Sequence, residues 1–144
     1  MSRENDRFFR ENPSVLAFLG DAVYEVYVRK QIYEKGILSP DRMNTAAIRY
    51  VRAEAQAAVY DALLSELSEK EQSVVRRAKN HKITSMPGNV DFMTYKKATA
   101  FEALIGYLDL IGEKERLQEI LARSMEIIDT AAINPERRTR GKRR

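Results

Sequence analysis

The sequence contains no cysteine and only one histidine, and no stretch approaches the roughly 20 apolar residues that a membrane-spanning helix needs. Without cysteine the chain can form neither disulfides nor thiolate-ligated metal centres, a composition that suits a reducing cytosol. The charged N-terminus also lacks the apolar segment of a secretory signal. We therefore expect a cytoplasmic protein without a membrane span.

Several signatures of common protein classes are also missing. The sequence shows no useful alternation of apolar and polar residues, no Gly-rich nucleotide loop, no Ser/His/Asp set and no internal repeat. These absences argue against a sheet-based RNA-binding module, a nucleotide-binding loop and a serine hydrolase. With 144 residues, the chain is expected to form one domain with a core of its own.

What the sequence does contain is helical periodicity bounded by good start and stop signals. Asn12-Pro13 and Ser39-Pro40 are typical of helix N-termini, and Gly36 and Gly112 of helix ends. Further boundaries are a break near Tyr50, a capping box at residues 68–71, a loop over residues 83–94, a cap at Thr94 and a breaker at Asn134-Pro135. The pattern predicts an all-α helical bundle.

Charge is distributed unevenly along the chain. The last eight residues, Arg137 to Arg144, carry six basic side chains and no acid, and the remainder holds 19 basic and 21 acidic residues. We expect a domain over residues 1–136 followed by a basic, disordered tail over residues 137–144. Such a tail favours polyanions, although it could equally be a solubilising appendage.

Two acidic residues lie inside apolar, helix-patterned stretches. Asp21 follows Phe18-Leu19-Gly20, and Glu102 lies within Thr99-Ala100-Phe101-Glu102-Ala103-Leu104-Ile105-Gly106. Aspartate and glycine side by side are unfavourable in mid-helix, which indicates a demand other than local stability. A buried carboxylate needs a partner, and Mg²⁺ could pair with both acids. Each acid taken alone could equally be a solvated or ion-paired residue at a helix edge.

The two segments resemble the carboxylate-bearing motifs of the ribonuclease III catalytic domain. Leu16-Ala17-Phe18-Leu19-Gly20-Asp21-Ala22-Val23 matches the first motif, and residues 101–106 match the second. The resemblance runs from about Asn12 to Ile133 and implies that Asp21 and Glu102 are catalytic residues that bind the metal. Ala17 and Thr99 stand where the family at large has two further acids. Both losses, and the lack of a double-stranded-RNA-binding domain, resemble the short branch called Mini-ribonuclease III.

This resemblance implies a function, a cofactor and partners. The family is a homodimeric, ribonuclease III-type helical bundle that cleaves double-stranded RNA with Mg²⁺ and leaves 5′-phosphate and 3′-hydroxyl ends. In the short branch the implied substrate is the precursor of the large-subunit (23S) ribosomal RNA, and a ribosomal protein is a candidate helper. Apolar residues on several sides of the Asp21 helix also favour a symmetric dimer; they are Leu16, Phe18, Leu19, Ala22, Val23 and Val26.

A basic run and the start of the Glu102 helix are the predicted RNA contacts. They comprise Arg76, Arg77, Lys79, Asn80, His81, Lys82, Tyr95, Lys96 and Lys97. The basic run could instead be a solvated helix end. His81 is disfavoured as a general base, and Glu25 is better explained by an ion pair with Arg29 than as a metal ligand. The main alternative function is a helical module that binds double-stranded RNA without cutting it.

Overall fold

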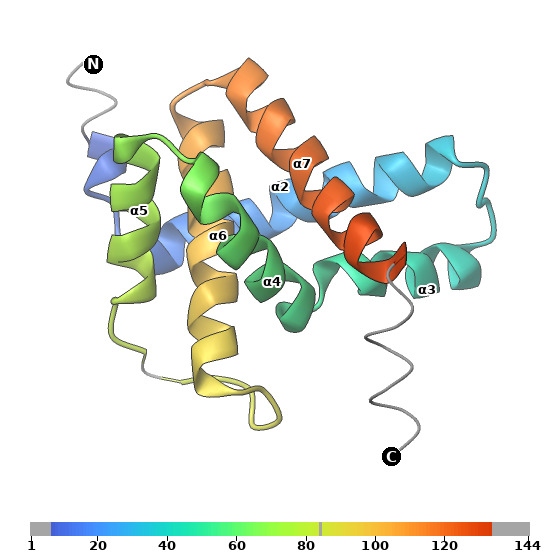
Figure 1. Cartoon of the computed structure of the whole chain (residues 1–144), viewed down its shortest axis with the longest axis horizontal. Helices are drawn as coiled ribbons and strands as arrows, with labels where there is room; N and C mark the ends of the chain where they lie inside the picture. Colours follow the sequence, from blue (N-terminus) through green and yellow to red (C-terminus); the bar gives the residue numbers. More distant parts are fainter. Residues whose placement is uncertain (1–6, 84, 134–144) are drawn as a thin grey trace.

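The computed structural model describes residues 7–83 and 85–133, and its regular elements there are helices (Figure 1). The elements are α2 (Pro13–Glu34), α3 (Pro40–Val51), α4 (Ala53–Leu63), the 3₁₀ turn η1 (Leu64–Glu66), α5 (Glu69–Lys79), α6 (Phe92–Leu110) and α7 (Lys114–Ile133). The expectation of an all-α fold is confirmed. No described helix is long and apolar enough to cross a membrane.

Local signals in the sequence account for most helix boundaries. The Asn12 side chain accepts a hydrogen bond from the Ser14 amide at 2.8 Å and begins α2 with Pro13 in its first turn. Gly36 has φ of +84°, a left-handed conformation that glycine tolerates, just beyond the end of the helix. The predicted break near Tyr50 is present, because extended Arg52 separates α3 from α4.

The start of α6 differs from the expectation. Thr94 was the predicted cap, but Asp91 takes this role and accepts a hydrogen bond from the Thr94 amide at 3.1 Å. Aspartate is a better N-cap than threonine because its carboxylate also interacts favourably with the helix dipole. The helix therefore begins almost one turn earlier, at Phe92.

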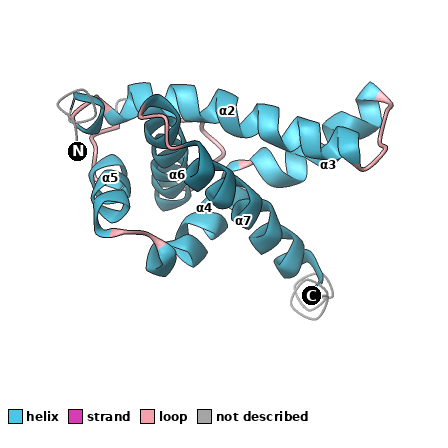
Figure 2. Cartoon of the chain, turned by 90° about the horizontal axis from the view of Figure 1, so that it is seen from above, coloured by secondary structure: helices cyan, strands magenta, loops and turns pink. Residues whose placement is uncertain are grey.

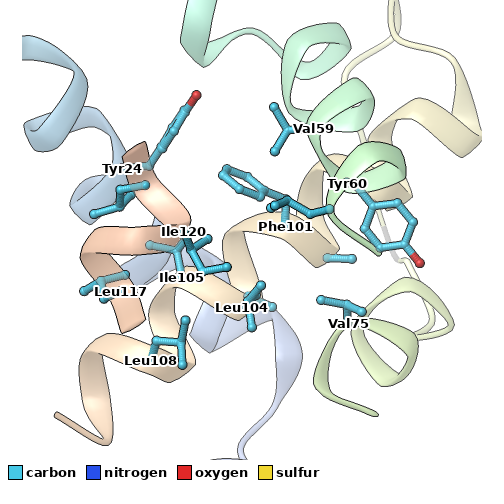
Figure 3. Close-up of a cluster of buried hydrophobic side chains, with 14 of the residues drawn as sticks. Tyr24, Val59, Tyr60, Val75, Phe101, Leu104, Ile105, Leu108, Leu117 and Ile120 are labelled. Atoms are coloured by element: carbon cyan, nitrogen blue, oxygen red, sulfur yellow. The ribbon is translucent and has the colours of Figure 1, made fainter. Parts of the chain in front are cut away.

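Helix α6 packs against α2, α4, α5 and α7, and in the view of Figure 1 helix α7 passes in front of α2. Helix α3 folds back along the distal half of α2 (Figure 2). The core gathers around Phe101 and Leu104 of α6 (Figure 3). The Tyr24 ring meets Phe101 edge to face, with centroids 5.0 Å apart, and its hydroxyl donates to the Tyr50 carbonyl oxygen at 2.9 Å.

Two further expectations concern the C-terminal segment and the apolar sides of α2. The helix-breaking Asn134-Pro135 and the basic tail over residues 137–144 lie outside the described residues. Leu16, one of the apolar residues on several sides of this helix, is 2% exposed and packs in the protein's own core. It is therefore not available to a partner.

Candidate active site

Helices α2 and α6 cross at a point where both have glycine. A Cβ atom on Gly20 would collide with the Glu102 carbonyl oxygen and lie 2.8 Å from the Gly106 amide nitrogen. A Cβ on Gly106 would likewise collide with the Leu16 carbonyl oxygen. Only glycine permits two helix backbones to touch in this way. Because Asp21 follows Gly20, the crossing brings its carboxylate to the Glu102 side chain.

The two acids interact directly. Glu102 is partly buried, whereas Asp21 is exposed at the mouth of the site. Burial raises the pKa of Glu102 to about 9, and the hydrogen bond and negative charge of Asp21 add to the rise. Two carboxyl groups can share a hydrogen bond only when one is protonated, and two ionised ones repel each other. The pair therefore needs either a proton or a cation.

Two further side chains face this pair. Gln56, from α4, is 2% exposed, and its side chain lies against the Glu102 carboxyl group. This contact lowers the pKa of Glu102, against the stronger effect of burial. The amide nitrogen Nε2 of Gln56 makes no hydrogen bond of ordinary geometry within the described structure. Glu25, one turn beyond Asp21, forms the predicted ion pair with Arg29 at 2.7 Å, and its charge also raises the pKa of Glu102.

The donor set can be compared with what a divalent ion requires. Ala17 is 7% exposed and supplies no ligand, and Thr99 offers a hydroxyl at most. Within residues 7–83 and 85–133, no three or more His, Cys, Asp or Glu side chains cluster in a way that would hold a metal. Mg²⁺ usually keeps several waters and needs only one or two protein carboxylates. The oxygens of Asp21 and Glu102 therefore fit Mg²⁺ better than a metal that requires a complete protein cage.

A polar cavity of about 330 Å³ lies between the start of α2, the end of α5 and the start of α6. It is lined by Asn12, Ser14, Ala78, His81, Lys82, Ile83, Ser85, Tyr95, Lys96 and Thr99. Thr99 is one helical turn before Glu102, and Ser14 is two turns before Asp21, so the cavity lies along the faces that carry the two acids. We call it the basic pocket, because Lys82 and Lys96 line it.

Four of the nine predicted RNA contacts line this pocket, and they come from two separate segments. His81 and Lys82 follow α5, whereas Tyr95 and Lys96 belong to the first turns of α6. The Lys96 ammonium group donates to the His81 carbonyl oxygen at 3.3 Å, which ties the two segments together. The structure therefore brings this part of the basic run next to the carboxylate pair.

Two of the predicted contacts are engaged elsewhere. The Arg77 guanidinium donates at 2.9–3.0 Å to three backbone carbonyl oxygens of the N-terminal segment, those of Phe9, Arg10 and Glu11. Lys97 lies about 100° around α6 from Lys96 and forms an ion pair with Asp61 of α4 at 2.9 Å. Both cations are held by the protein itself, so they are the least free to meet a phosphate.

The remaining three predicted contacts lie near the C-terminal end of α5. Arg76 is exposed and donates to the Ser73 hydroxyl at 3.3 Å, Lys79 is half-buried, and Asn80 is the exposed C-cap. They form a polar end to the helix next to the basic pocket. Their position suits contact with a polyanion but does not by itself distinguish it from a solvated helix end.

Gln56 is a site residue that the sequence interpretation missed. The buried residues of α4 are Gln56, Ala57, Val59, Tyr60 and Leu63. A signal was available, because Gln56 is three residues before Val59 and therefore shares the buried face. A lone polar residue on an apolar helix face is the same kind of signal that identified Asp21 and Glu102.

An all-α domain in which two helices cross through paired glycines, with one carboxylate on each, has the arrangement of a metal-dependent helical hydrolase, and comparison with known proteins identifies the class as a nuclease. The Ribonuclease III domain family matches residues 14–112. The chain thus belongs to the ribonuclease III family, in its short Mini-ribonuclease III branch, and is an endoribonuclease.

Individual relatives support this assignment. The chain is 48% identical to the "Mini-ribonuclease 3" of Brevibacillus brevis over 118 residues, which covers 82% of this chain and 88% of that protein. It is 44% identical to the protein of the same name from Symbiobacterium thermophilum, covering 81% of this chain and 90% of the relative. A crystal structure from Fusobacterium nucleatum has a TM-score of 0.74 and 32% identity, and the match covers 81% of this chain and 93% of that one.

Proposed function

We propose that this endoribonuclease cleaves double-stranded RNA with Mg²⁺ at the Asp21–Glu102 pair. One observation carries the proposal: the acids of the two motifs meet at a helix crossing, and burial together with Asp21 raises the pKa of Glu102 to about 9. A pair that strongly resists double ionisation in the absence of a cation is suited to bind one.

The two acids differ in exposure. The exposed Asp21 carboxylate and the partly buried Glu102 carboxylate would together hold the ion, whose charge would offset that of the RNA backbone. When bound, Mg²⁺ supplies charge stabilisation for the phosphodiester and lowers the pKa of water. Attack of water on phosphorus forms one P–O bond and breaks the bond to the 3′ oxygen, which takes up a proton. The ends are then 5′-phosphate and 3′-hydroxyl.

The basic pocket supports an RNA duplex as the substrate. Lys82 and Lys96 can neutralise backbone phosphates, and the hydroxyl groups of Ser14 and Tyr95 can donate to phosphate oxygens. Double-stranded RNA is recognised mainly by its shape and backbone. We assign Arg77 a supporting role, because its three hydrogen bonds fix the segment that leads into α2 beside the pocket.

A second copy of the chain is the proposed partner of the exposed face of α2. Val15, Phe18 and Val26 lie on one face of this helix and are 44%, 79% and 51% exposed. Ala22 and Val26 border a largely apolar groove of about 500 Å³, whose far side is formed by Leu117 and Leu121 of α7. An exposed apolar stripe beside an apolar groove is suited to a two-fold contact in which each copy covers the other.

The dimer can be tested by placing a charge on this face. Phe18→Asp should convert a dimer into a monomer in light scattering, because a carboxylate would be buried without a partner. Leu38→Asp is the matched control, because Leu38 is 66% exposed but lies in the connection between α2 and α3. A wild-type monomer, or a dimer that survives Phe18→Asp, would contradict this part of the proposal.

The natural substrate in this proposal is the precursor of 23S ribosomal RNA in the cytoplasm, as the short branch implies. A ribosomal protein as helper stays a prediction, as does a contribution of the basic tail to RNA affinity. The substrate and the helper follow from membership of the short branch, and the role of the tail follows from its charge.

The decisive experiment is incubation of the full chain with long duplex RNA, with Mg²⁺ and with a chelator, followed by analysis of the product ends. We expect cutting only with Mg²⁺, and 5′-phosphate and 3′-hydroxyl ends. Asp21→Asn is the control for a contaminating nuclease. Retention of duplex RNA in a shift assay without cutting would instead indicate the non-catalytic RNA-binding module.

A further inference from the structure

Gln56 is a polar residue in an environment that otherwise selects apolar side chains. It lies on α4 on the same face as Val59 and Leu63, which are 0% and 2% exposed. It is itself 2% exposed, and its Nε2 atom makes no standard hydrogen bond within the described residues. An unsatisfied buried amide is destabilising, so its presence requires a reason other than packing.

The neighbour of Gln56 supplies that reason. Its buried side chain lies against the Glu102 carboxyl group, one of the two acids proposed to bind the metal. The Nε2 group of Gln56 is therefore a donor without a standard partner, placed beside a carboxyl group that can accept. An amide N–H can donate to either form of a carboxyl group, but its hydrogen bond to the ionised carboxylate is the stronger one. Gln56 is therefore placed to favour the form of Glu102 that binds a cation.

We propose that Gln56 is a positioning residue, whose Nε2 group donates a hydrogen bond to the ionised Glu102 carboxylate and holds it in the orientation that binds the divalent ion. This inference rests on the proposed function and adds a residue from a third helix to the site. The hydrogen bond missing at Nε2 would then be completed once Glu102 is ionised. Groups that orient a metal-binding side chain typically affect metal affinity or activity about 10–100-fold.

The test compares Gln56→Met with a matched control, Gln72→Met. Methionine retains the length and volume of glutamine but removes the amide. Gln72 is a purely structural glutamine, because its Nε2 donates to the carbonyl oxygens of Leu64 and Leu67 at 3.0 and 3.3 Å. Mg²⁺ affinity is measured by calorimetric titration, metal-free stability by thermal unfolding, and kcat and KM by cleavage of duplex RNA.

The two variants should show opposite patterns. For Gln56→Met we expect about 10-fold weaker Mg²⁺ binding and a 10–100-fold lower kcat, with little change in KM and a metal-free Tm at or above that of the wild type. Gln72→Met should lower Tm and leave Mg²⁺ affinity and kcat unchanged. Gln56→Asn, which retains an amide, should recover part of the lost affinity.

Three outcomes would overturn the inference. In the first, folded Gln56→Met binds Mg²⁺ and cleaves RNA like the wild type. In the second, it loses stability alone, as expected for Gln72→Met. In the third, neither Gln56→Met nor the smaller Gln56→Ala folds, which would make Gln56 a packing residue. The proposed function can fail without the inference. A wild-type protein that binds Mg²⁺ but cuts no RNA would refute the proposed function. A loss of Mg²⁺ affinity in Gln56→Met would in that case still support the role of Gln56.

Discussion

Two glutamates in this protein, the buried Glu71 and the partly buried Glu102, have opposite surroundings. Both carboxylate oxygens of Glu71 accept hydrogen bonds from Arg116 at 2.8 Å, and one also accepts from the Ser68 amide at 2.9 Å. Burial alone would raise the pKa of Glu71, but these donors outweigh it and the pKa is lowered. Glu102 faces Asp21 instead, and its pKa rises to about 9.

The difference separates an acid with a structural role, Glu71, from Glu102, which we propose is functional. Glu71 belongs to a capping box and an ion pair that fasten α7 to the start of α5, and its charge is neutralised within the chain. Glu102 is left with an excess of negative charge, which only a proton or an external cation can relieve. Such an arrangement reduces the stability of the free protein and is retained where function requires it.

The largest effect should appear in catalysis. Asp21→Asn and Glu102→Gln are each expected to reduce cleavage by at least about 1,000-fold, or ~4 kcal/mol of barrier, because each removes a ligand from a site with two. Circular dichroism and a duplex-binding assay should show that folding and RNA binding remain. Glu71→Gln is the control, and it should cleave RNA normally at any temperature at which it is folded. Near-normal cleavage by either site variant would remove that residue from the metal site.

The geometry that joins the two acids can also be broken. Gly106→Ala should cost about 3 kcal/mol or more of unfolding free energy, because its Cβ would collide with the backbone of α2, which cannot move aside easily. Urea denaturation measures this loss. Gly88→Ala is the control, since a Cβ there has nothing within 4 Å. Equal stability of the two variants would show that the helices do not cross as closely as described.

The sequence indicated that Asp21 and Glu102 belong together because each combines a local signal with a family motif, and the structure does bring the two acids together. Both stand out as polar residues within apolar helical patterns, and Gly20 beside Asp21 indicated a demand other than local stability. What the sequence could not show is that Gly20 of one motif touches the backbone of the other. That contact depends on the crossing of helices about 80 residues apart.

Charge in a sequence does not reveal the intramolecular partners of a basic residue. Arg77 and Lys97 are predicted phosphate contacts, and within the fold their side chains contact the N-terminal segment and Asp61. These partners come from distant positions, which no local pattern indicates. Periodicity alone also does not say which side of α2 faces the core, because this helix is apolar on several sides; the structure shows that Leu16 is on that side.

A smaller effect is expected on the free energy of unfolding when Glu71 loses its partner. Arg116→Met leaves Glu71 buried without its counter-charge, and we expect a loss of about 2–4 kcal/mol of unfolding free energy. Cleavage measured at a temperature where the variant is folded should be unaffected, because the pair lies at the junction of α5 and α7. A variant as stable as the wild type would mean that Arg116 contributes little to holding α7.

The Glu102 charge should lower the stability of the fold, whereas the Glu71 ion pair raises it, and the pH dependence of unfolding distinguishes the two effects. Its folded-state pKa, about 9, lies above the ordinary value of 4.5, so its contribution to stability is fully present below about pH 4.5 and is lost as the pH rises toward 9. Glu71 has a lowered pKa, so its contribution is present above its ordinary value of 4.5 and is lost in acid. Removing the charge at position 102 should therefore stabilise the metal-free protein at neutral pH.

In the absence of divalent ions, Glu102→Gln should exceed the wild type by about 2 kcal/mol in unfolding free energy near pH 7.5, and the two should converge near pH 4.5. Thermal or urea unfolding across this range measures the difference. Added Mg²⁺ should narrow it by stabilising only the wild type, because a ligand stabilises the state that binds it. If the difference in unfolding free energy between Glu102→Gln and the wild type does not vary with pH, the pKa of Glu102 is not raised by its surroundings. The contrast with Glu71 would then have no physical basis.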